Sequence, residues 1–207
     1  MLSSLKLYVQ NNDWLKQFIH QSLVLYYRPR FWVRVLLFPF YIKRGRKAVI
    51  RSSARLDLFP FNKVTIGKKT IIEDFVTLNN AVGDLVIGNN VIVGMGNTII
   101  GPVEIKDNVL FAQNIVASAL NHVFEDPDVP IVDQGVNTKK ITIDENSWIG
   151  ANVTITQGVH IGKHCVIGAG SVVNKDIPDY HVAIGNPIRL VKRYNFETKN
   201  WEKIPKQ

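Results

Sequence analysis

The chain has 207 residues, of which 46% are hydrophobic and 20% are charged, as in an ordinary globular protein. Its single cysteine, Cys165, excludes an intrachain disulfide. The longest apolar stretch, FWVRVLLFPFYI, contains an Arg and a Pro and is shorter than the ~20 residues that a membrane-spanning helix needs. No secretory signal is recognisable, so we expect a cytoplasmic protein.

The first part of the chain holds most of the positive charge. Residues 1–55 contain eleven Lys and Arg and one acid, whereas residues 56–207 contain fourteen Lys and Arg and sixteen acids. Large apolar side chains alternate with these cations, which argues against a nucleic-acid-binding face. We expect a basic, aromatic and helical extension over residues 1–60. This extension is expected either to cap the open end of the next domain or to contact the anionic inner surface of the membrane.

From Ile66 onward the sequence repeats every six residues. The run from Ile87 reads IGNNVI VGMGNT IIGPVE IKDNVL FAQNIV ASALNH, and the run from Ile143 reads IDENSW IGANVT ITQGVH IGKHCV IGAGSV VNKDIP. Positions one and five of each block favour an inward-facing strand, and Gly, Asn and Asp at positions two to four favour corners. Three blocks make one turn of a triangular prism, and five turns are expected.

The regular pattern stops after His122 and resumes at Ile143. Excursions from a repeat gather on one face and are often functional, so a loop over residues 123–142 is expected to border a site. We expect His122 at a prism corner at the root of this loop. Histidine is the residue whose ordinary pKa suits proton transfer near neutral pH.

The sequence resembles a known enzyme family in four places: the Asn-His pair before the loop, SWIGANVTI after it, IGAGSVV followed by Lys175, and GNPIR near the end. These motifs resemble the hexapeptide-repeat acetyltransferases, in particular galactoside and maltose O-acetyltransferases and the sugar O-acetyltransferases of bacterial surface-polysaccharide synthesis. The resemblance implies an all-β, left-handed parallel β-helix over residues 61–185. A short C-terminal helix and tail is expected over residues 186–207, with Asn186 as N-cap and Pro187 in the first turn.

The resemblance also implies an activity, which is transfer of an acetyl group from acetyl-CoA to a sugar or glycan hydroxyl. His122 would be the catalytic base, and Glu125 or Asp126, or else a backbone carbonyl, would orient its ring. The expected acceptor contacts are Asn97 and Asn121, although Gly94 occupies the position where family members often carry an acceptor-binding Asn. A homotrimer with CoA bound between chains is implied. The positions that resemble the CoA-binding residues are Trp148, Ala151, Ala169, Asn174, Lys175, Arg189 and Lys192.

Two other functions stay open from the residues alone. One is N-acylation of an amino sugar, and the other is a non-catalytic repeat scaffold that docks to a membrane or to partner enzymes. No metal is expected, because His160 and His164 fall at different corner positions and lack a third imidazole at matching spacing. Cys165 occupies an inward position and is expected to fill the core.

Overall fold

A computed structural model describes residues 12–25 and 28–205, which divide into two compact units, Met1–Tyr41 and Ile42–Gln207. The first unit contains α2 (Asp13–Leu23), which begins where the Leu15 N–H donates to the Asn12 side chain at 3.1 Å. The remaining elements of this unit are β1 (Val24–Leu25) and β2 (Arg28–Pro29), which pair antiparallel, the π-helix η1 (Val33–Leu37) and α3 (Phe38–Tyr41). Helices therefore make up most of residues 13–41, as expected for the extension, whereas residues 1–11 of the expected segment lie outside the described residues. None of the described helices is long and apolar enough to cross a membrane.

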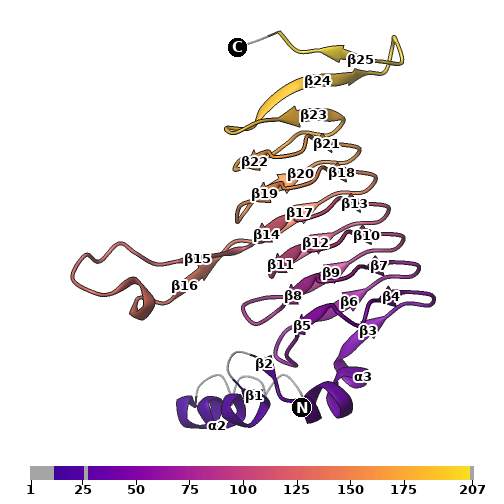
Figure 1. Ribbon diagram of the computed structural model, residues 1–207. Helices are drawn as coiled ribbons and strands as arrows, with labels where there is room; N and C mark the ends of the chain where they lie inside the picture. Colours follow the sequence, from indigo (N-terminus) through magenta and orange to yellow (C-terminus); the bar gives the residue numbers. More distant parts are fainter. Residues whose placement is uncertain (1–11, 26–27, 206–207) are drawn as a thin grey trace. The chain divides into compact units, whose positions relative to one another are not determined.

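The second unit is a triangular prism of stacked coils whose three faces are sheets (Figure 1). The long sheet has nine strands, in the order β25 (Asn200–Lys203), β24 (Arg189–Asn195), β23 (His181–Ile184), β21 (Val166–Ile167), β18 (Trp148–Ile149), β13 (Leu110–Phe111), β10 (Ile92–Val93), β7 (Ile71–Ile72) and β4 (Val49–Ile50). The β14 sheet contains β22 (Val172–Val173), β19 (Thr154–Ile155), β14 (Val116–Ser118), β11 (Thr98–Ile100), β8 (Thr77–Asn79) and β5 (Arg55–Asp57). The β17 sheet contains β20 (His160–Ile161), β17 (Ile141–Ile143), β12 (Val103–Ile105), β9 (Leu85–Ile87), β6 (Val64–Ile66) and β3 (Ile42–Arg44).

Successive coils pair as parallel strands in register, which confirms the left-handed parallel β-helix. The core consists of the inward positions of the six-residue repeat. At first positions, Ile72 and Ile155 are fully buried, and at fifth positions so are Val91 and Ile115. Burial of one apolar side chain per strand and per corner therefore drives the stacking.

The prism has one coil more than the repeat predicts. β3, β4 and β5 form a first coil that starts at Ile42, about twenty residues before the expected boundary at residue 61. Small Ala48 and Ala54 fill the inward corner positions of this coil, where the second coil carries the larger Thr70 and Val76. This coil is stabilised by its pairing with the second coil. Its own hexapeptide pattern is too weak to be recognised in the sequence.

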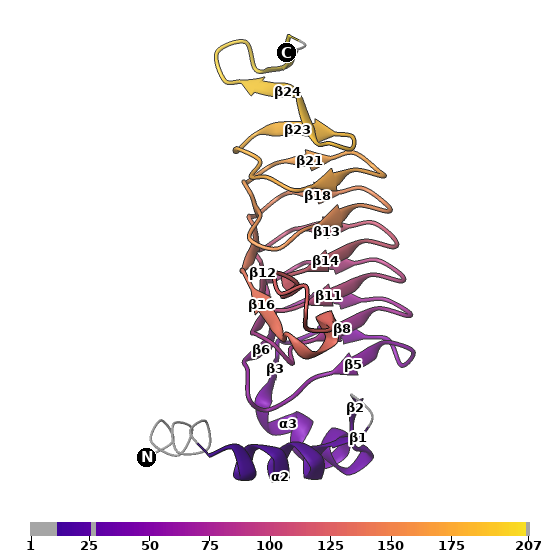
Figure 2. The ribbon, with the colours of Figure 1, turned by 90° about the vertical axis from the view of Figure 1, so that its left-hand side faces the viewer.

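The loop after the fourth coil is an arm that projects from the prism in Figure 1 and points toward the viewer in Figure 2. It contains an antiparallel ribbon, β15 (Leu120–His122) with β16 (Val136–Thr138), and a 3-10 helix, η2 (Ile131–Asp133). The Lys139 N–H donates to the Ala119 carbonyl at 3.1 Å, and β17 then pairs with β12 of the coil below. The prism thus closes across the root of the arm.

The expected C-terminal helix is wrong. β23, β24 and β25 form an antiparallel extension of the long sheet, with β24 paired to β23 and β25 paired to β24. The edge of β23 offers backbone hydrogen-bond partners to β24, and these distant partners favour a strand where the local sequence favours a helix. Tyr194 and Trp201 face each other across the last strand pair, with ring centroids 5.5 Å apart.

Candidate functional site

His122 lies in the arm, just beyond the prism. It is exposed and is the last residue of β15, where it pairs with Val136 of β16. The expected corner position is therefore wrong by a few residues. The chain completes its coil at Ala119, whose N–H donates to the Ile100 carbonyl at 3.0 Å, and from Leu120 onward it pairs with the returning strand. His122 still has the expected relation to the loop, because it stands at the base of the arm on a hydrogen-bonded ribbon.

The two acids proposed to orient the histidine serve the arm itself. Glu125 accepts a hydrogen bond from the Phe124 N–H at 2.9 Å, and Asp126 accepts from the Asp128 N–H at 3.0 Å. Among the described residues, no side chain bonds to the His122 ring. Asn121 is exposed, and as the neighbour of His122 in a strand it projects to the opposite face of the ribbon.

Asn97 belongs to the core of the prism. It is fully buried, its side-chain N–H donates to the Ala112 carbonyl at 2.9 Å, and its oxygen accepts from the Ile115 N–H at 2.6 Å. Its expected contact with the acceptor is therefore wrong. Gly94 has no room for a longer residue, since a Cβ there would lie 2.6 Å from the Ala112 carbonyl oxygen. An acceptor-binding Asn at that position does not fit this backbone.

Ala151 and Ala169 occupy the same place in successive coils, at the edge between the long sheet and the β14 sheet. The Ala151 carbonyl accepts from the Gly170 N–H at 2.8 Å, whereas the N–H groups of both alanines have no acceptor among the described residues. The equivalent position carries Met95 and Gln113 in the coils below. The small side chains of the two upper coils therefore leave free backbone donors open to a ligand.

Trp148 lies on the outer surface of the long sheet and is about half exposed. It is part of an apolar ladder in which outward-facing residues pair in register from coil to coil. The members of this ladder are Val49, Ile71, Ile92, Leu110, Trp148, Val166 and Val182. An apolar stripe along a whole face is typical of a surface that another molecule covers.

The basic candidates lie in the upper part of the prism. Lys175 is exposed with Asn174 at the corner after β22, on the same edge as the arm root. Arg189 and Lys192 are exposed on β24, opposite β23. No ion pair is found for Lys175, Arg189 or Lys192 within residues 12–25 and 28–205, so their charges are available to an anionic ligand.

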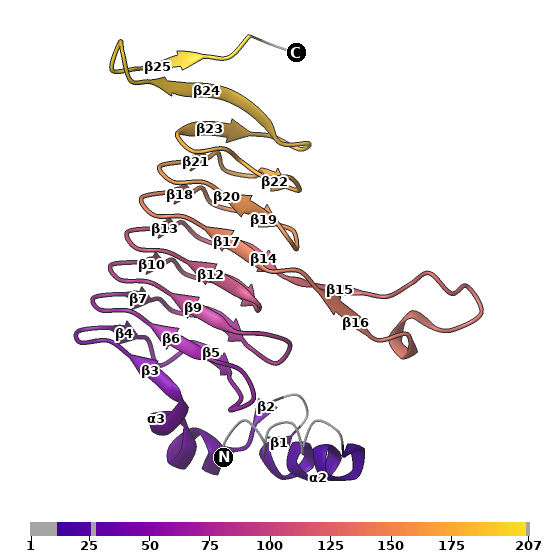
Figure 3. The same ribbon diagram turned by 180° about the vertical axis from the view of Figure 1, so that it is seen from behind.

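The candidates fall into two groups in one chain. His122, Asn121, Asn174 and Lys175 lie along the edge from which the arm leaves, whereas Trp148, Ala151 and Ala169 lie on the long sheet or its edge with the β14 sheet. Figures 1 and 3 show the arm on one side of the prism and β18 on the other. A single chain does not bring the two groups together.

Gln157 is a polar residue that the sequence reasoning missed. It lies at the corner above the arm root, where the next residue, Gly158, donates its N–H to the Lys139 carbonyl at 3.0 Å. The Gln157 side-chain oxygen is buried and has no hydrogen-bond partner among the described residues. Buried polar atoms are nearly always satisfied, so this amide is a candidate to contact a ligand near the arm. The hexapeptide pattern predicts a corner residue at this position and does not indicate that the side chain is buried without a partner.

An ionic cluster fixes the returning strand of the arm. Glu104 on the β17 sheet bonds to both Lys106 and Lys140, and Lys140 directly follows the arm. These bonds, led by the one to Lys106, hold the pKa of the Glu104 carboxyl below its ordinary value. The pKa of Lys106 is raised by the same hydrogen bond.

Cys165, His160 and His164 have partners of their own. Cys165 is fully buried, its thiol donates to the Pro178 carbonyl at 3.0 Å, and burial raises its pKa to about 11, so it is a core residue. His160 pairs with Asp144 at 2.7 Å, and His164 stacks on Tyr180. The described part of the chain contains no cluster of three or more His, Cys, Asp or Glu side chains that could hold a metal ion.

Comparison with known proteins agrees with this architecture. A family model described as bacterial transferase hexapeptide (six repeats) matches residues 140–175. The chain is 33% identical over 184 residues to the probable acetyltransferase Rv3034c of Mycobacterium tuberculosis, covering 86% of this chain and 60% of that protein. It is 31% identical over 155 residues to the galactoside O-acetyltransferase of Lactococcus lactis, covering 74% of each chain.

Among solved structures, a mutant of AntD, an N-acyltransferase from Bacillus cereus, in complex with dTDP and coenzyme A, is similar with a TM-score of 0.65. That similarity covers 80% of this chain and 90% of the other at 22% identity, so it shows the shared fold. The galactoside O-acetyltransferase is similar over most of both chains, which shows the family. The chain therefore belongs to the hexapeptide-repeat acetyltransferases, a family of enzymes that transfer acyl groups.

Proposed function

We propose that this protein transfers the acetyl group of acetyl-CoA to a hydroxyl of a sugar or glycan in cell-surface polysaccharide synthesis. The observation that carries the proposal is the position of His122, exposed on a hydrogen-bonded ribbon at the base of the arm in an otherwise regular prism. The galactoside O-acetyltransferase similarity favours a hydroxyl over an amino group as acceptor.

In the proposed reaction, His122 removes the proton from the acceptor hydroxyl as its oxygen attacks the thioester carbonyl. A backbone N–H, for which that of Ala151 is the best candidate, stabilises the developing oxyanion. The C–S bond then breaks, and the imidazolium returns its proton to the departing thiolate. The transfer is direct, and Cys165 takes no part because it is buried with a raised pKa.

CoA fits the upper coils. Its pantetheine arm would run along the edge that Ala151 and Ala169 leave open, beside the Trp148 ring. Its phosphates would pair with the unpaired cations named above, together with Asn174. The two groups of candidates meet only if two copies adjoin, so the proposal includes a homotrimer with each site between neighbouring chains. The apolar ladder on the long sheet is the surface that such a neighbour would cover.

The test compares wild-type protein with His122→Ala by free-thiol release from acetyl-CoA, across nucleotide sugars and glycan oligosaccharides. Turnover by the variant should fall at least ~10²-fold, the usual effect of losing a general base. Thermal stabilisation by CoA should persist, because the histidine is not assigned to CoA binding. His160→Ala is the matched control, since that histidine is exposed and paired only with Asp144.

Three results would contradict the proposal. Near-normal turnover by His122→Ala would remove the histidine from the mechanism. Faster acetylation of an amino sugar than of its hydroxyl counterpart would favour N-acylation instead. Absence of any CoA-dependent stabilisation of the wild-type protein would support a non-catalytic scaffold.

A further inference from the structure

The first unit exposes an unusual number of large apolar side chains. Trp14 and Phe18 lie one turn apart on α2 with their rings stacked at 5.7 Å, and both are exposed. Phe31 is 80% exposed and Phe40 is 87% exposed. The other exposed apolar residues of this unit are Leu25, Trp32, Val35 and Leu36. Exposed rings in such density mark a surface that binds something apolar.

The charges around these rings are all of one sign. Between Trp14 and Leu56 the sequence contains ten Lys and Arg and no Asp or Glu. Arg28 and Arg34 of the first unit are exposed, and they lie in the sequence between the aromatic residues. Segments that lie in the headgroup layer of a membrane typically contain cationic residues interleaved with Trp, Phe and Leu.

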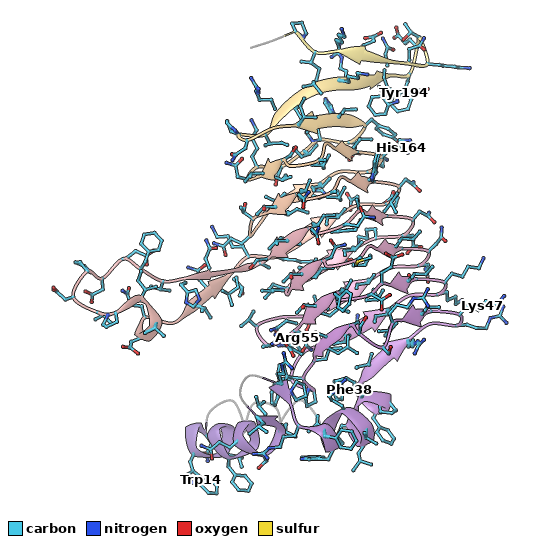
Figure 4. The ribbon with its side chains drawn as sticks, in the orientation of Figure 1. Trp14, Phe38, Lys47, Arg55, His164 and Tyr194 are labelled. Carbon is cyan, nitrogen blue, oxygen red and sulfur yellow. The ribbon has the colours of Figure 1, made fainter. Side chains whose placement is uncertain are left out.

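The second unit carries an independent basic cluster in its first two coils. Arg46, Lys47, Lys68 and Lys69 are exposed at neighbouring corners, and the Lys69 N–H donates to the Arg46 carbonyl at 3.1 Å. None of the four side chains forms an ion pair within the described parts of the chain. Figure 4 shows Lys47 pointing outward from this edge.

Comparison with the higher coils shows that the lysines are not needed by the backbone. Lys47 and Lys69 have left-handed φ values of 61° and 58°. The equivalent corner residue in the next three coils is Asn, at Asn90, Asn108 and Asn146, also with positive φ. Asn tolerates this conformation better than Lys does, so the first two coils carry cations where the fold alone favours Asn.

We propose that the exposed aromatic residues of the first unit and, independently, the corner cations at Arg46, Lys47, Lys68 and Lys69 of the second unit both contact an anionic phospholipid membrane. The exposed rings enter the headgroup layer, and the arginines and corner lysines attract the lipid phosphates. These contacts would hold the enzyme where a lipid-linked acceptor is found, and they act separately from acetyl transfer. A nucleic-acid partner is disfavoured because bulky apolar side chains separate the cations.

The experiment measures co-sedimentation of the full chain with phosphatidylcholine vesicles and with vesicles of mixed phosphatidylcholine and phosphatidylglycerol. We expect binding to the mixed vesicles only, weakened as salt rises from about 0.1 M to about 1 M. Lys47→Asn with Lys69→Asn should weaken binding at least about fivefold, given the effect of one cation near such a surface. Phe31→Ala with Phe40→Ala should also weaken it.

Two controls separate lipid binding from folding and from catalysis. Phe196→Ala removes a ring that is 62% exposed at the opposite end of the second unit, and it should bind vesicles as the wild type does. The lysine variant should melt no lower than the wild type and should acetylate a soluble acceptor at the normal rate without vesicles.

Several results would overturn the proposal. These are equal binding to neutral and anionic vesicles, no binding to either, or unchanged binding by both double variants. Binding to duplex DNA in place of vesicles would assign a different partner. A lowered Tm in the phenylalanine variant, without loss of vesicle binding, would show that the rings pack within the protein and only cap the prism.

Discussion

His122 and Trp148 lie on different sides of the prism within one chain. His122 belongs to the arm that leaves beyond β14, whereas Trp148 stands on the outer surface of β18 in the long sheet. Because these residues carry the proposed base and part of the proposed CoA site, the proposed reaction would need two adjoining copies. The partner's surface would complete a site that each chain holds only in part.

Complementation between two inactive variants tests this arrangement. His122→Ala and Ala151→Leu with Arg189→Glu should each be inactive alone, the first in chemistry and the second in CoA binding. If the residues that fail in the two variants come from different chains, subunits mixed by unfolding and refolding should regain up to about a quarter of wild-type activity. No recovery in verified mixed oligomers would place both groups of residues in one subunit.

Substitution at the open edge of the upper coils should affect acetyl-CoA more than the acceptor. Ala151→Leu would cover the free N–H groups of this edge, so KM for acetyl-CoA should rise and kcat should fall by ~10-fold or more, as when an oxyanion donor is lost. Gln113→Leu places the same side chain at the equivalent position one coil below and should change the kinetics little. Equal effects of both substitutions would argue against a site at Ala151.

Asn97 and Asn121 should respond differently to truncation. Asn97→Ala would leave the Ile115 N–H buried and unpaired, which costs about 1–3 kcal/mol, so the melting temperature should fall. Asn121→Ala should leave stability unchanged and should change KM for the acceptor little, because its side chain is exposed on the face of the ribbon opposite His122. Differential scanning calorimetry and acceptor titrations check the two outcomes. A stable Asn97→Ala variant with a raised acceptor KM would restore its binding role.

The ionic cluster at the arm root should make stability depend on pH. The pKa of Glu104 in the folded protein lies below its ordinary value, so its pairing stabilises the protein at neutral pH and is lost as pH falls through the folded pKa. Glu104→Gln should lower Tm at pH about 7 and flatten the loss of Tm at acid pH. The exposed Glu197→Gln serves as control. Melting curves that stay parallel for wild type and Glu104→Gln would exclude this contribution.

The prism could be predicted from the repeat because the residue types in each six-residue block show which positions are buried. Ile143, Ile149 and Ile155 recur at every sixth position, and every one is fully buried. Inward and outward positions could therefore be assigned residue by residue. The first coil could not be predicted in the same way, because Ala48 and Ala54 have small side chains that bury little surface. This coil is held instead by strand pairing with the coil above.

The ends and the site depended on pairing between distant segments. The local sequence at Asn186-Pro187 is typical of a helix start. In the structure, however, the following residues pair with the edge of β23 and form β24. The six-residue count placed His122 on the prism, whereas its strand pairs with β16 fourteen residues later. The division of the candidate residues between two sides of the prism is a property of the coil path, and spacing along the sequence does not reveal it.

The closed root of the arm has a consequence for how this enzyme can change over evolution. Because the Lys139 N–H meets the Ala119 carbonyl and β17 pairs with β12, the coils stack as they would without the intervening residues. Arms of other lengths or sequences can therefore be grafted at this junction without repacking the core. If the arm contacts the acceptor as proposed, acceptor preference would diverge by exchange of a surface module, while the coils that carry the proposed CoA edge would be inherited unchanged.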